Sequence, residues 1–183
     1  MSALLAAYPE GARENDKYGQ LPLHYACWKQ APPEVQLALL AAYPEGAREK
    51  SKYGWLPLHY ACANQAPPEV QLALLAAYPE GAREKDKDDQ LPLHFACANQ
   101  APPEVVSALL AASPEGAREK DKNGGLPLHF ACAKRAPPEV VSALLAAYPE
   151  GAREEYKGGK ANLNRAHKSM RGTCVREPAA GGL

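Results

Sequence analysis

The sequence predicts an all-α solenoid, in which short helix pairs stack so that each unit contacts only its neighbours. Two motifs that recur at a constant spacing of 35 residues support this prediction. Leu-Pro-Leu-His begins at Leu21, Leu56, Leu91 and Leu126, and Pro-Glu-Gly-Ala-Arg-Glu begins at Pro9, Pro44, Pro79, Pro114 and Pro149. Because the spacing never changes, each unit is one structural module without inserted loops.

Each unit begins with a turn followed by a first short helix. The segment 16–19, Asp-Lys-Tyr-Gly, is typical of a turn because Asp and Gly supply turn geometry. Its copies begin at Ser51, Asp86 and Asp121, and the third copy carries Asp89 where the others have glycine. The first helix is expected from Pro22, where the missing N–H of proline costs nothing, to about Gln30.

A second helix is expected over residues 34–43. Two prolines, at 32 and 33, end the first helix and open the second, and Pro44 ends the second. Val35, Ala38, Leu39 and Ala42 fall at helical spacing and predict one apolar face. Neither helix can bury such a face alone, so stacking of neighbouring units is expected to create a continuous core.

Composition divides the chain into an array and a tail. The array is predicted over residues 1–155, with a half unit at 1–15 and full units starting near 16, 51, 86 and 121. Lys and Arg equal Asp and Glu at 21 each, but residues 156–183 hold six basic residues and one acidic residue. Two interpretations of this tail stay open: a decayed half unit that caps the stack and is followed by disorder, or a simple tail without a repeat. The start in the middle of a unit also leaves open that the chain is a fragment of a larger protein.

The repeated motif resembles the ankyrin repeat signature. Residues 16–27, Asp-Lys-Tyr-Gly-Gln-Leu-Pro-Leu-His-Tyr-Ala-Cys, are similar to the ankyrin glycine turn followed by Thr-Pro-Leu-His. Glu34-Val35 and Leu39-Leu40 are similar to the ankyrin second helix, and the resemblance covers residues 1–155. Leucine replaces the threonine before Pro-Leu-His, so a side-chain cap is lost. The resemblance implies helix pairs with short turn fingers, and a protein partner bound on the fingers and the concave face.

The repeated histidines and cysteines are expected to be structural. His24 precedes Cys27 by three residues, and the pair recurs in each unit. A structural zinc needs four ligands at ~2.0–2.3 Å, whereas stacked helices separate equivalent residues by ~10 Å. The resemblance implies that each histidine hydrogen-bonds neighbouring turns. Repeat cysteines are likewise too far apart for disulfides and suit a reducing compartment, with Cys174 the candidate reactive thiol. We therefore expect no enzyme activity, no metal and no cofactor.

The candidate partner-binding residues lie where the units differ from one another. The resemblance assigns binding to the fingers and to the first helix after its small residues. These positions are Lys17, Tyr18, Gln20, Trp28 and Lys29 in unit one, Lys52, Tyr53, Trp55 and Asn64 in unit two, and Asp88, Gln90 and Asn99 in unit three. Both tryptophans fall within the set, and aromatic anchors dominate interface energetics. We predict a site biased to units one and two; the alternative for Trp28 is packing of the first layer of the stack.

The charge and hydropathy of the chain bear on nucleic acid and membranes as alternative partners. A helical repeat that reads RNA needs basic residues along the array, whereas the body before the tail is acidic, so nucleic acid is disfavoured. The basic tail offers a second hypothesis, binding to nucleic acid or to an acidic surface. No apolar run approaches the ~18 residues that span a bilayer, so no membrane partner is expected. We expect a monomer in the cytoplasm or nucleus.

Overall fold

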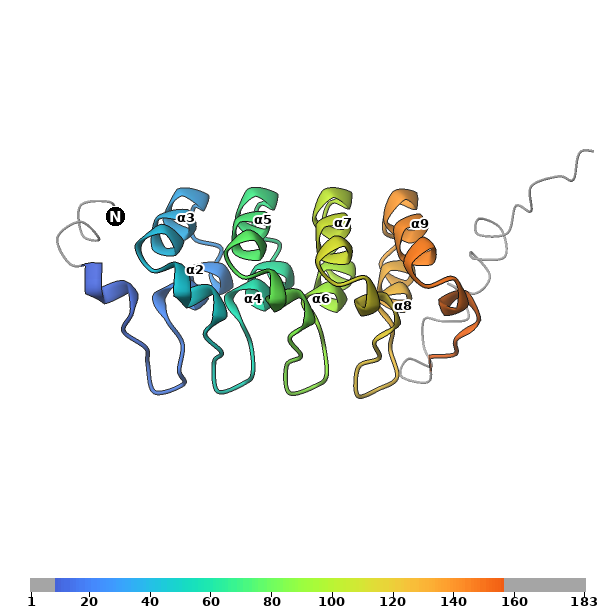
Figure 1. Ribbon diagram of the computed structural model, residues 1–183, viewed down its shortest axis with the longest axis horizontal. Coiled ribbons are helices and arrows are strands. Elements are labelled where there is room, and N and C mark those ends of the chain that lie inside the picture. Colours follow the sequence, from blue (N-terminus) through green and yellow to red (C-terminus); the bar gives the residue numbers. More distant parts are fainter. Residues whose placement is uncertain (1–8, 157–183) are drawn as a thin grey trace, which may run out of the picture.

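The structure, a computed structural model, describes residues 9–156, and within this range it is a row of helix pairs without strands (Figure 1). The predicted all-α solenoid is confirmed. The first helices of units one to four are α2 (Pro22–Trp28), α4 (Pro57–Ala63), α6 (Pro92–Ala98) and α8 (Pro127–Ala133). The second helices are α3 (Pro33–Ala42), α5 (Pro68–Ala77), α7 (Pro103–Ala112) and α9 (Pro138–Ala147). Short 3-10 helices follow at η1 (Pro9–Ala12), η2 (Pro44–Arg48), η3 (Pro79–Arg83), η4 (Pro114–Arg118) and η5 (Pro149–Arg153).

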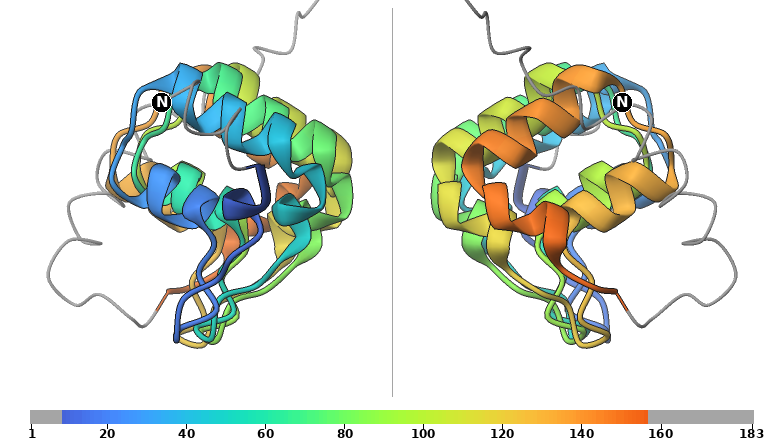
Figure 2. Two further views of the ribbon diagram at one scale, coloured as in Figure 1. Left: turned by 90° about the vertical axis from the view of Figure 1, so that its left-hand side faces the viewer. Right: turned by 90° about the vertical axis from the view of Figure 1, so that its right-hand side faces the viewer.

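The helices form two layers, with the turns projecting from one edge. First helices pack against first helices of the next unit, and second helices pack against second helices. The views along the stack show the two layers side by side and the turns extending together below the first helices (Figure 2). We call these turns fingers one to four: residues 16–20, 51–55, 86–90 and 121–125. Residues 1–8 of the predicted half unit (1–15) and the tail from 157 onward lie outside the described residues, and the division into array and tail stays a prediction.

The helices begin where prolines predict them and end slightly earlier. The first helix of unit one ends at Trp28 rather than near Gln30, and the second spans Pro33–Ala42 rather than 34–43. Gln30 takes a left-handed conformation at φ +53°, as do its counterparts in the other units, and this reverses the chain toward the second helix. The Gln30 side chain then donates a hydrogen bond to the carbonyl of Asn64 in the next unit at 2.6 Å. A contact between units therefore stabilises a turn that usually needs glycine.

The buried face of the second helix is wider than predicted. Leu39 is buried as expected, but Ala38 and Ala42 are only half-buried, while Leu40 and the polar Gln36 are buried. Ala42 still packs against the core as a partly buried residue, and the buried face is wider because the second helix packs on its own first helix and also on the next second helix. The Gln36 amide donates to the Ala31 carbonyl at 2.6 Å, which offsets part of the cost of burying it.

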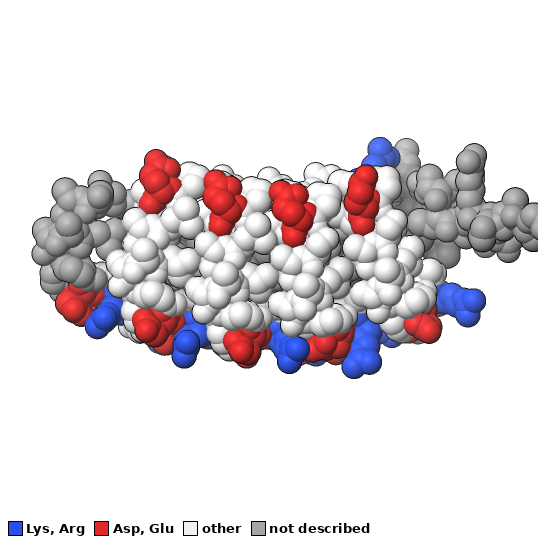
Figure 3. Space-filling model, turned by 45° about the horizontal axis from the view of Figure 1, so that its top comes forward, with Lys and Arg blue, Asp and Glu red and all other residues white. Residues whose placement is uncertain are grey.

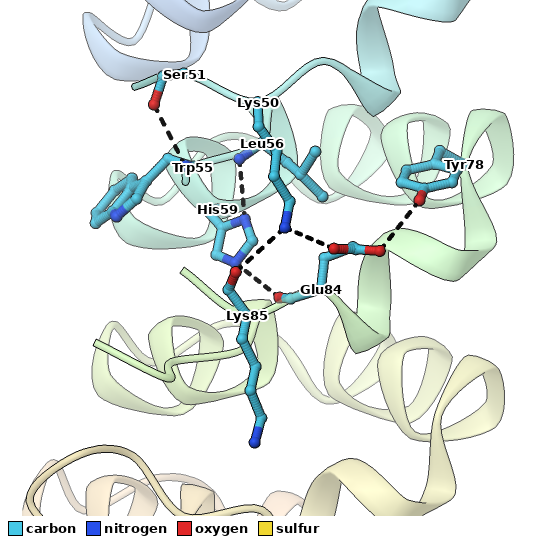
Figure 4. Close-up of polar contacts among 8 residues, drawn as sticks. All are labelled: Lys50, Ser51, Trp55, Leu56, His59, Tyr78, Glu84 and Lys85. Carbon is cyan, nitrogen blue, oxygen red and sulfur yellow. Dashed lines mark hydrogen bonds and ion pairs between the residues drawn. The ribbon is translucent and has the colours of Figure 1, made fainter. Parts of the chain in front are cut away.

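Each joint between units is built around the repeated histidine (Figure 4). His59 Nδ1 accepts the N–H of Leu56 at 3.1 Å, so its proton is on Nε2, which donates at 3.1 Å to the carbonyl of Glu84, in the segment that leads into unit three. His24, His94 and His129 repeat this bridge, which confirms the structural role expected for these residues. Nδ1 satisfies the N–H of the N-cap leucine, as the third helical residue does in a capping box, while the leucine itself supplies no side-chain cap.

Glu84 collects further contacts at the same joint. Lys50 Nζ lies 2.6 Å from one carboxylate oxygen of Glu84, and the Tyr78 hydroxyl donates to the other at 3.4 Å (Figure 4). The ion pair recurs as Lys85 with Glu119 at 2.8 Å and as Lys120 with Glu154 at 2.9 Å. The exposed location of these pairs limits each to less than about 1 kcal/mol, so they align neighbouring units more than they stabilise them.

Each finger is closed by a side chain at its first position. Asp16 Oδ1 accepts the backbone N–H groups of Tyr18 and Gln20, both at 2.8 Å. Asp86 and Asp121 do the same in fingers three and four. In finger two the Ser51 hydroxyl makes the equivalent contacts at 3.3 Å. These turns hold the fingertip residues in one orientation relative to the first helices.

Replacing Asp89 by glycine is expected to raise the free energy of unfolding by about 1 kcal/mol. Asp89 has φ +58°, at the position that Gly19, Gly54 and Gly124 occupy with φ +69°, +81° and +80°. A side chain is strained in this region, whereas glycine adopts it freely. Urea unfolding of both forms measures the difference.

The reverse change, Gly124→Asp, is the matched control. A Cβ at Gly124 would meet nothing within 4 Å, so its cost reports backbone strain alone. We expect a loss of stability of similar size. A gain, or no change in either variant, would contradict the strain assigned to Asp89.

Candidate functional site

A groove of about 830 Å³ runs along the fingers and first helices of units one and two and reaches finger three. Its lining combines six aromatic side chains with a few polar and charged ones. The lining residues are Tyr18, Gln20, Tyr25, Trp28, Tyr53, Trp55, Tyr60, Ala63, Asn64, Lys87 and Asp88. We call this the aromatic groove.

Its aromatic rings pack on one another in pairs. The Tyr18 and Tyr53 rings at the tips of adjacent fingers stack with centroids 6.2 Å apart. On α2 the Tyr25 and Trp28 rings lie 5.8 Å apart. Such pairs restrict ring rotation, so the groove offers a largely preformed aromatic surface.

Four of these rings are open to solvent. Relative exposures are 51% for Tyr53, 42% for Trp28, 40% for Tyr18 and 37% for Tyr25, and these are the exposed large hydrophobic residues among those that the structure describes. Single exposed apolar residues are common, but a cluster of this kind in one groove is typical of an interaction site. Whether Trp28 binds a partner or packs the first layer of the stack is not decided by its exposure, and its role as a binding residue stays a prediction.

Seven predicted site residues line the aromatic groove: Tyr18, Gln20, Trp28, Tyr53, Trp55, Asn64 and Asp88. Lys17, Lys29 and Lys52 are exposed beside it. The ammonium group of Lys29 lies 3.7 Å from the centroid of the Trp28 ring, and that of Lys17 lies 5.0 Å from the Tyr18 centroid. Their assignment as partner-binding residues stays a prediction.

Gln90 and Asn99 are placed apart from the groove lining. The Gln90 amide donates to Asp121 Oδ2 at 3.2 Å, toward finger four. The Asn99 amide donates to the Phe95 carbonyl at 2.9 Å on its own helix end. These contacts tie both side chains to units three and four.

Two predicted residues support the groove from beneath. Gln20 is only 7% exposed, and its amide donates to the Tyr60 hydroxyl at 2.6 Å. The Trp55 ring is half-buried, with its centroid 4.7 Å from each of the Tyr60 and Phe95 rings. Both side chains therefore position Tyr60 between units one and two.

Tyr25 and Tyr60 are groove residues that the sequence prediction missed. Tyr25 and Tyr60 occupy one repeat position, which is Phe95 and Phe130 in units three and four. This change from tyrosine in units one and two to phenylalanine in units three and four is the signal that could have identified them.

The Tyr25 hydroxyl adds a charge-assisted hydrogen bond at the edge of the groove, donating to Asp16 Oδ2 at 2.9 Å. This hydrogen bond raises the pKa of Tyr25. Burial opposes ionisation of Asp16, but its hydrogen bonds with the Gln20 N–H, the Tyr25 hydroxyl and the Tyr18 N–H outweigh it and lower the pKa of the carboxyl. Finger one is therefore joined to α2 through an ionised Asp16.

The repeated histidines and cysteines outside the aromatic groove pack within the array. No group of three or more His, Cys, Asp or Glu is placed to hold a metal within residues 9–156. Burial raises the pKa of the Cys27 thiol to about 12 and raises that of Cys62 and Cys97 as well, so these thiols stay protonated. Cys174 lies outside the described residues.

Charges on the second-helix side are arranged in rows. Glu34 lies in the first turn of α3, and Glu69, Glu104 and Glu139 lie at the same place in α5, α7 and α9. Figure 3 shows acidic groups repeating along one edge, alternating acidic and basic groups along the other, and an uncharged band between. This face carries no continuous basic stripe of the kind that nucleic-acid binding uses. Within the described part of the chain, no helix is long and apolar enough to cross a membrane.

The fold defines a helix-pair solenoid with short fingers, and comparison with known families gives the class. Family models described as ankyrin repeats match residues 4–61 (many copies) and residues 67–155 (3 copies). The chain belongs to the ankyrin repeat family. A search of curated proteins found no match. Ankyrin repeats are generally protein–protein interaction modules and typically serve as binding scaffolds rather than enzymes.

Proposed function

We propose that this ankyrin array binds a protein partner in the aromatic groove of units one and two. The observation that carries the proposal is the gathering of four exposed aromatic side chains in one groove: Tyr18, Tyr25, Trp28 and Tyr53. Tyr and Trp combine a large apolar area with a polar group, and they are enriched among the residues that dominate interface energies.

The array is suited to hold this groove open. Finger one is tied to α2 by the Asp16–Tyr25 hydrogen bond, and it is tied to finger two by the Lys52 N–H, which donates to the Tyr18 carbonyl at 2.8 Å. A groove that needs no rearrangement loses less conformational entropy when a partner binds. The rings of Trp28 and Tyr53 can then supply binding free energy through the apolar area that they still expose.

Replacing Trp28 and Tyr53 together by alanine is expected to weaken partner binding by at least about a hundredfold, since each anchor of this type contributes about 2 kcal/mol or more. Both side chains are largely exposed, so the variant should keep its fold. The intact chain and the variant are used to capture proteins from a lysate. The dissociation constant of the purified partner is then measured for each by calorimetry.

The matched control is Asn123→Ala, which removes the unit-four counterpart of Tyr18 and Tyr53. It should retain the partner. Equal affinity of the Trp28/Tyr53 variant for the partner would overturn the proposal. So would loss of binding when only residues 157–183 are deleted, because that result would assign binding to the basic tail.

A further inference from the structure

We propose that the aromatic groove accepts a proline-rich segment in the polyproline II conformation with acidic residues three positions apart. This inference rests on the proposed function, because it specifies the partner chemistry of the same site. It is carried by the charges beside the groove, the spacing of the fingers and the aromatic lining.

Lysines stand at the tips of successive fingers along the groove. Lys17 and Lys52 are exposed at the same position of fingers one and two, and Lys87 of finger three lines the groove. Lys29, at the end of α2, adds another positive charge beside Trp28. The groove is therefore accompanied by one fingertip ammonium group in each of units one to three, with Lys29 as an additional positive charge in unit one.

Positive charge exceeds negative charge at the fingers of units one and two, where two lysines stand beside a single carboxylate, that of Asp16 next to Lys17. Finger one contains one acidic residue, Asp16, which is engaged with the Tyr25 hydroxyl and with the backbone of its own turn, and finger two contains none. In finger three Asp88 lines the groove, and its carboxylate lies 3.9 Å from Lys122 Nζ. Asp86 and Asp88 flank Lys87 in the sequence and Asp89 follows, so carboxylates of a partner are favoured over fingers one and two and disfavoured at finger three.

The spacing of the fingers selects an extended partner. Packed helices of neighbouring units lie about 8–10 Å apart, so Lys17 and Lys52 repeat along the stack at about that distance. A polyproline II segment has three residues per turn and a rise of about 3.1 Å per residue. Every third side chain therefore returns to the same face after about 9.3 Å, and two carboxylates at that spacing can each meet one lysine.

The aromatic lining favours the remaining residues of such a segment. Aromatic grooves bind polyproline II segments because the extended backbone is already ordered and proline rings pack on Tyr and Trp faces. The backbone carbonyls of such a segment need donors, which the hydroxyls of Tyr18 and Tyr53 and the Trp28 indole N–H can provide. Pairing with a β-strand is disfavoured, because the described residues contain no strand whose edge could accept one.

The test uses synthetic peptides and the full chain labelled with nitrogen-15. The chain has two tryptophans, so its indole N–H signals report on the groove directly. A peptide of Glu-Pro-Pro triplets should shift both signals. A Gln-Pro-Pro peptide should bind about fivefold or more weakly, in line with the loss of about 1 kcal/mol of charge pairing. A Lys-Pro-Pro peptide should cause no shift at the same concentration.

A charge reversal distinguishes the lysine row from general attraction. Lys17→Glu combined with Lys52→Glu should abolish binding of the Glu-Pro-Pro peptide and allow binding of the Lys-Pro-Pro peptide. The matched control, Lys134→Glu, reverses the unit-four counterpart of Lys29 at an exposed position and should bind like the intact chain.

Three results would overturn the inference: equal binding of the Glu and Gln peptides, an equal loss in the Lys134 control, or binding of only a helical peptide with glutamates seven residues apart. If no proline-rich peptide binds but the Trp28/Tyr53 variant still loses its protein partner, the proposed site stands and this partner chemistry is wrong. If the variant also keeps its partner, both proposals fail.

Discussion

Acidification from pH 7 to pH 4 is expected to lower the free energy of unfolding by about 6 kcal/mol through two histidines alone, about 3 kcal/mol for each. Burial lowers the pKa of His24 and His59 from 6.5 to about 4, and their hydrogen bonds to backbone carbonyls only partly offset this effect. Burial lowers the pKa of His94 in the same direction.

The free energy of unfolding falls with pH because the unfolded chain binds protons at a higher pH than the folded array does. A histidine with a lowered pKa stays neutral in the folded array, while the unfolded chain takes up its proton near pH 6.5. Its contribution to stability is therefore fully present above pH 6.5 and is lost as the pH falls toward 4. A cation at His59 would also place a second proton on Nδ1, which now accepts the Leu56 N–H. Urea unfolding at half-unit steps of pH measures the slope.

Between pH 6.5 and 5, the effect of the histidines on the free energy of unfolding can be measured separately from that of the carboxylates. Hydrogen bonds from Lys50 lower the pKa of Glu84 below its ordinary 4.5, despite the opposing effect of burial, so this ion pair weakens only at lower pH. His59→Gln removes one titrating group and should reduce the pH slope by about one proton in that window, whatever it costs at pH 7. An unchanged slope in this variant would show that the histidine joints do not control acid stability.

The positions of the helices could be predicted because prolines mark them locally. Pro22, Pro33 and Pro44 act through backbone geometry that depends on few neighbours. The end of the first helix could not be predicted as well, because the left-handed Gln30 is supported by a hydrogen bond to Asn64 in the next unit. Such a contact depends on how the units stack.

Burial of Gln36 and Gln20 illustrates the same limit. Hydrophobic periodicity places a glutamine on the surface, but the stack covers Gln36 from two sides, and Gln20 finds its partner Tyr60 40 residues away. The groove could be anticipated from Trp28 and Trp55, because these residues differ from their counterparts in all the other units. Tyr25 and Tyr60 were missed because a Tyr-to-Phe change reads as conservative unless the hydroxyl has a partner.

Replacing Leu74 by alanine is expected to lower the free energy of unfolding by about 3–4 kcal/mol, the range for a leucine truncated in a closely packed core. Leu74 is 1% exposed on α5, which packs against α3, α7 and α4. Its counterparts are Leu39, at 9% exposure in unit one, and Leu109 and Leu144, each at 1%. Leu39→Ala is the matched control and should cost less, because its site is less completely enclosed. Equal losses for Leu39 and Leu74 would contradict this expectation.

The same leucine series tests whether the array unfolds as one unit. In such a stack each unit contacts only its neighbours, and the interfaces compensate for the instability of a single unit. If one layer is weakened so far that its interfaces no longer do so, the units on its two sides unfold separately. Both tryptophans lie in units one and two, so indole fluorescence follows the N-terminal half, while circular dichroism follows all helices. Leu109→Ala weakens unit three, so the fluorescence midpoint in urea should lie above the dichroism midpoint. Leu39→Ala should bring the fluorescence midpoint to or below the dichroism midpoint. Coincident midpoints in both variants would show that the interfaces between units are strong enough to keep the array cooperative after the loss of a core leucine.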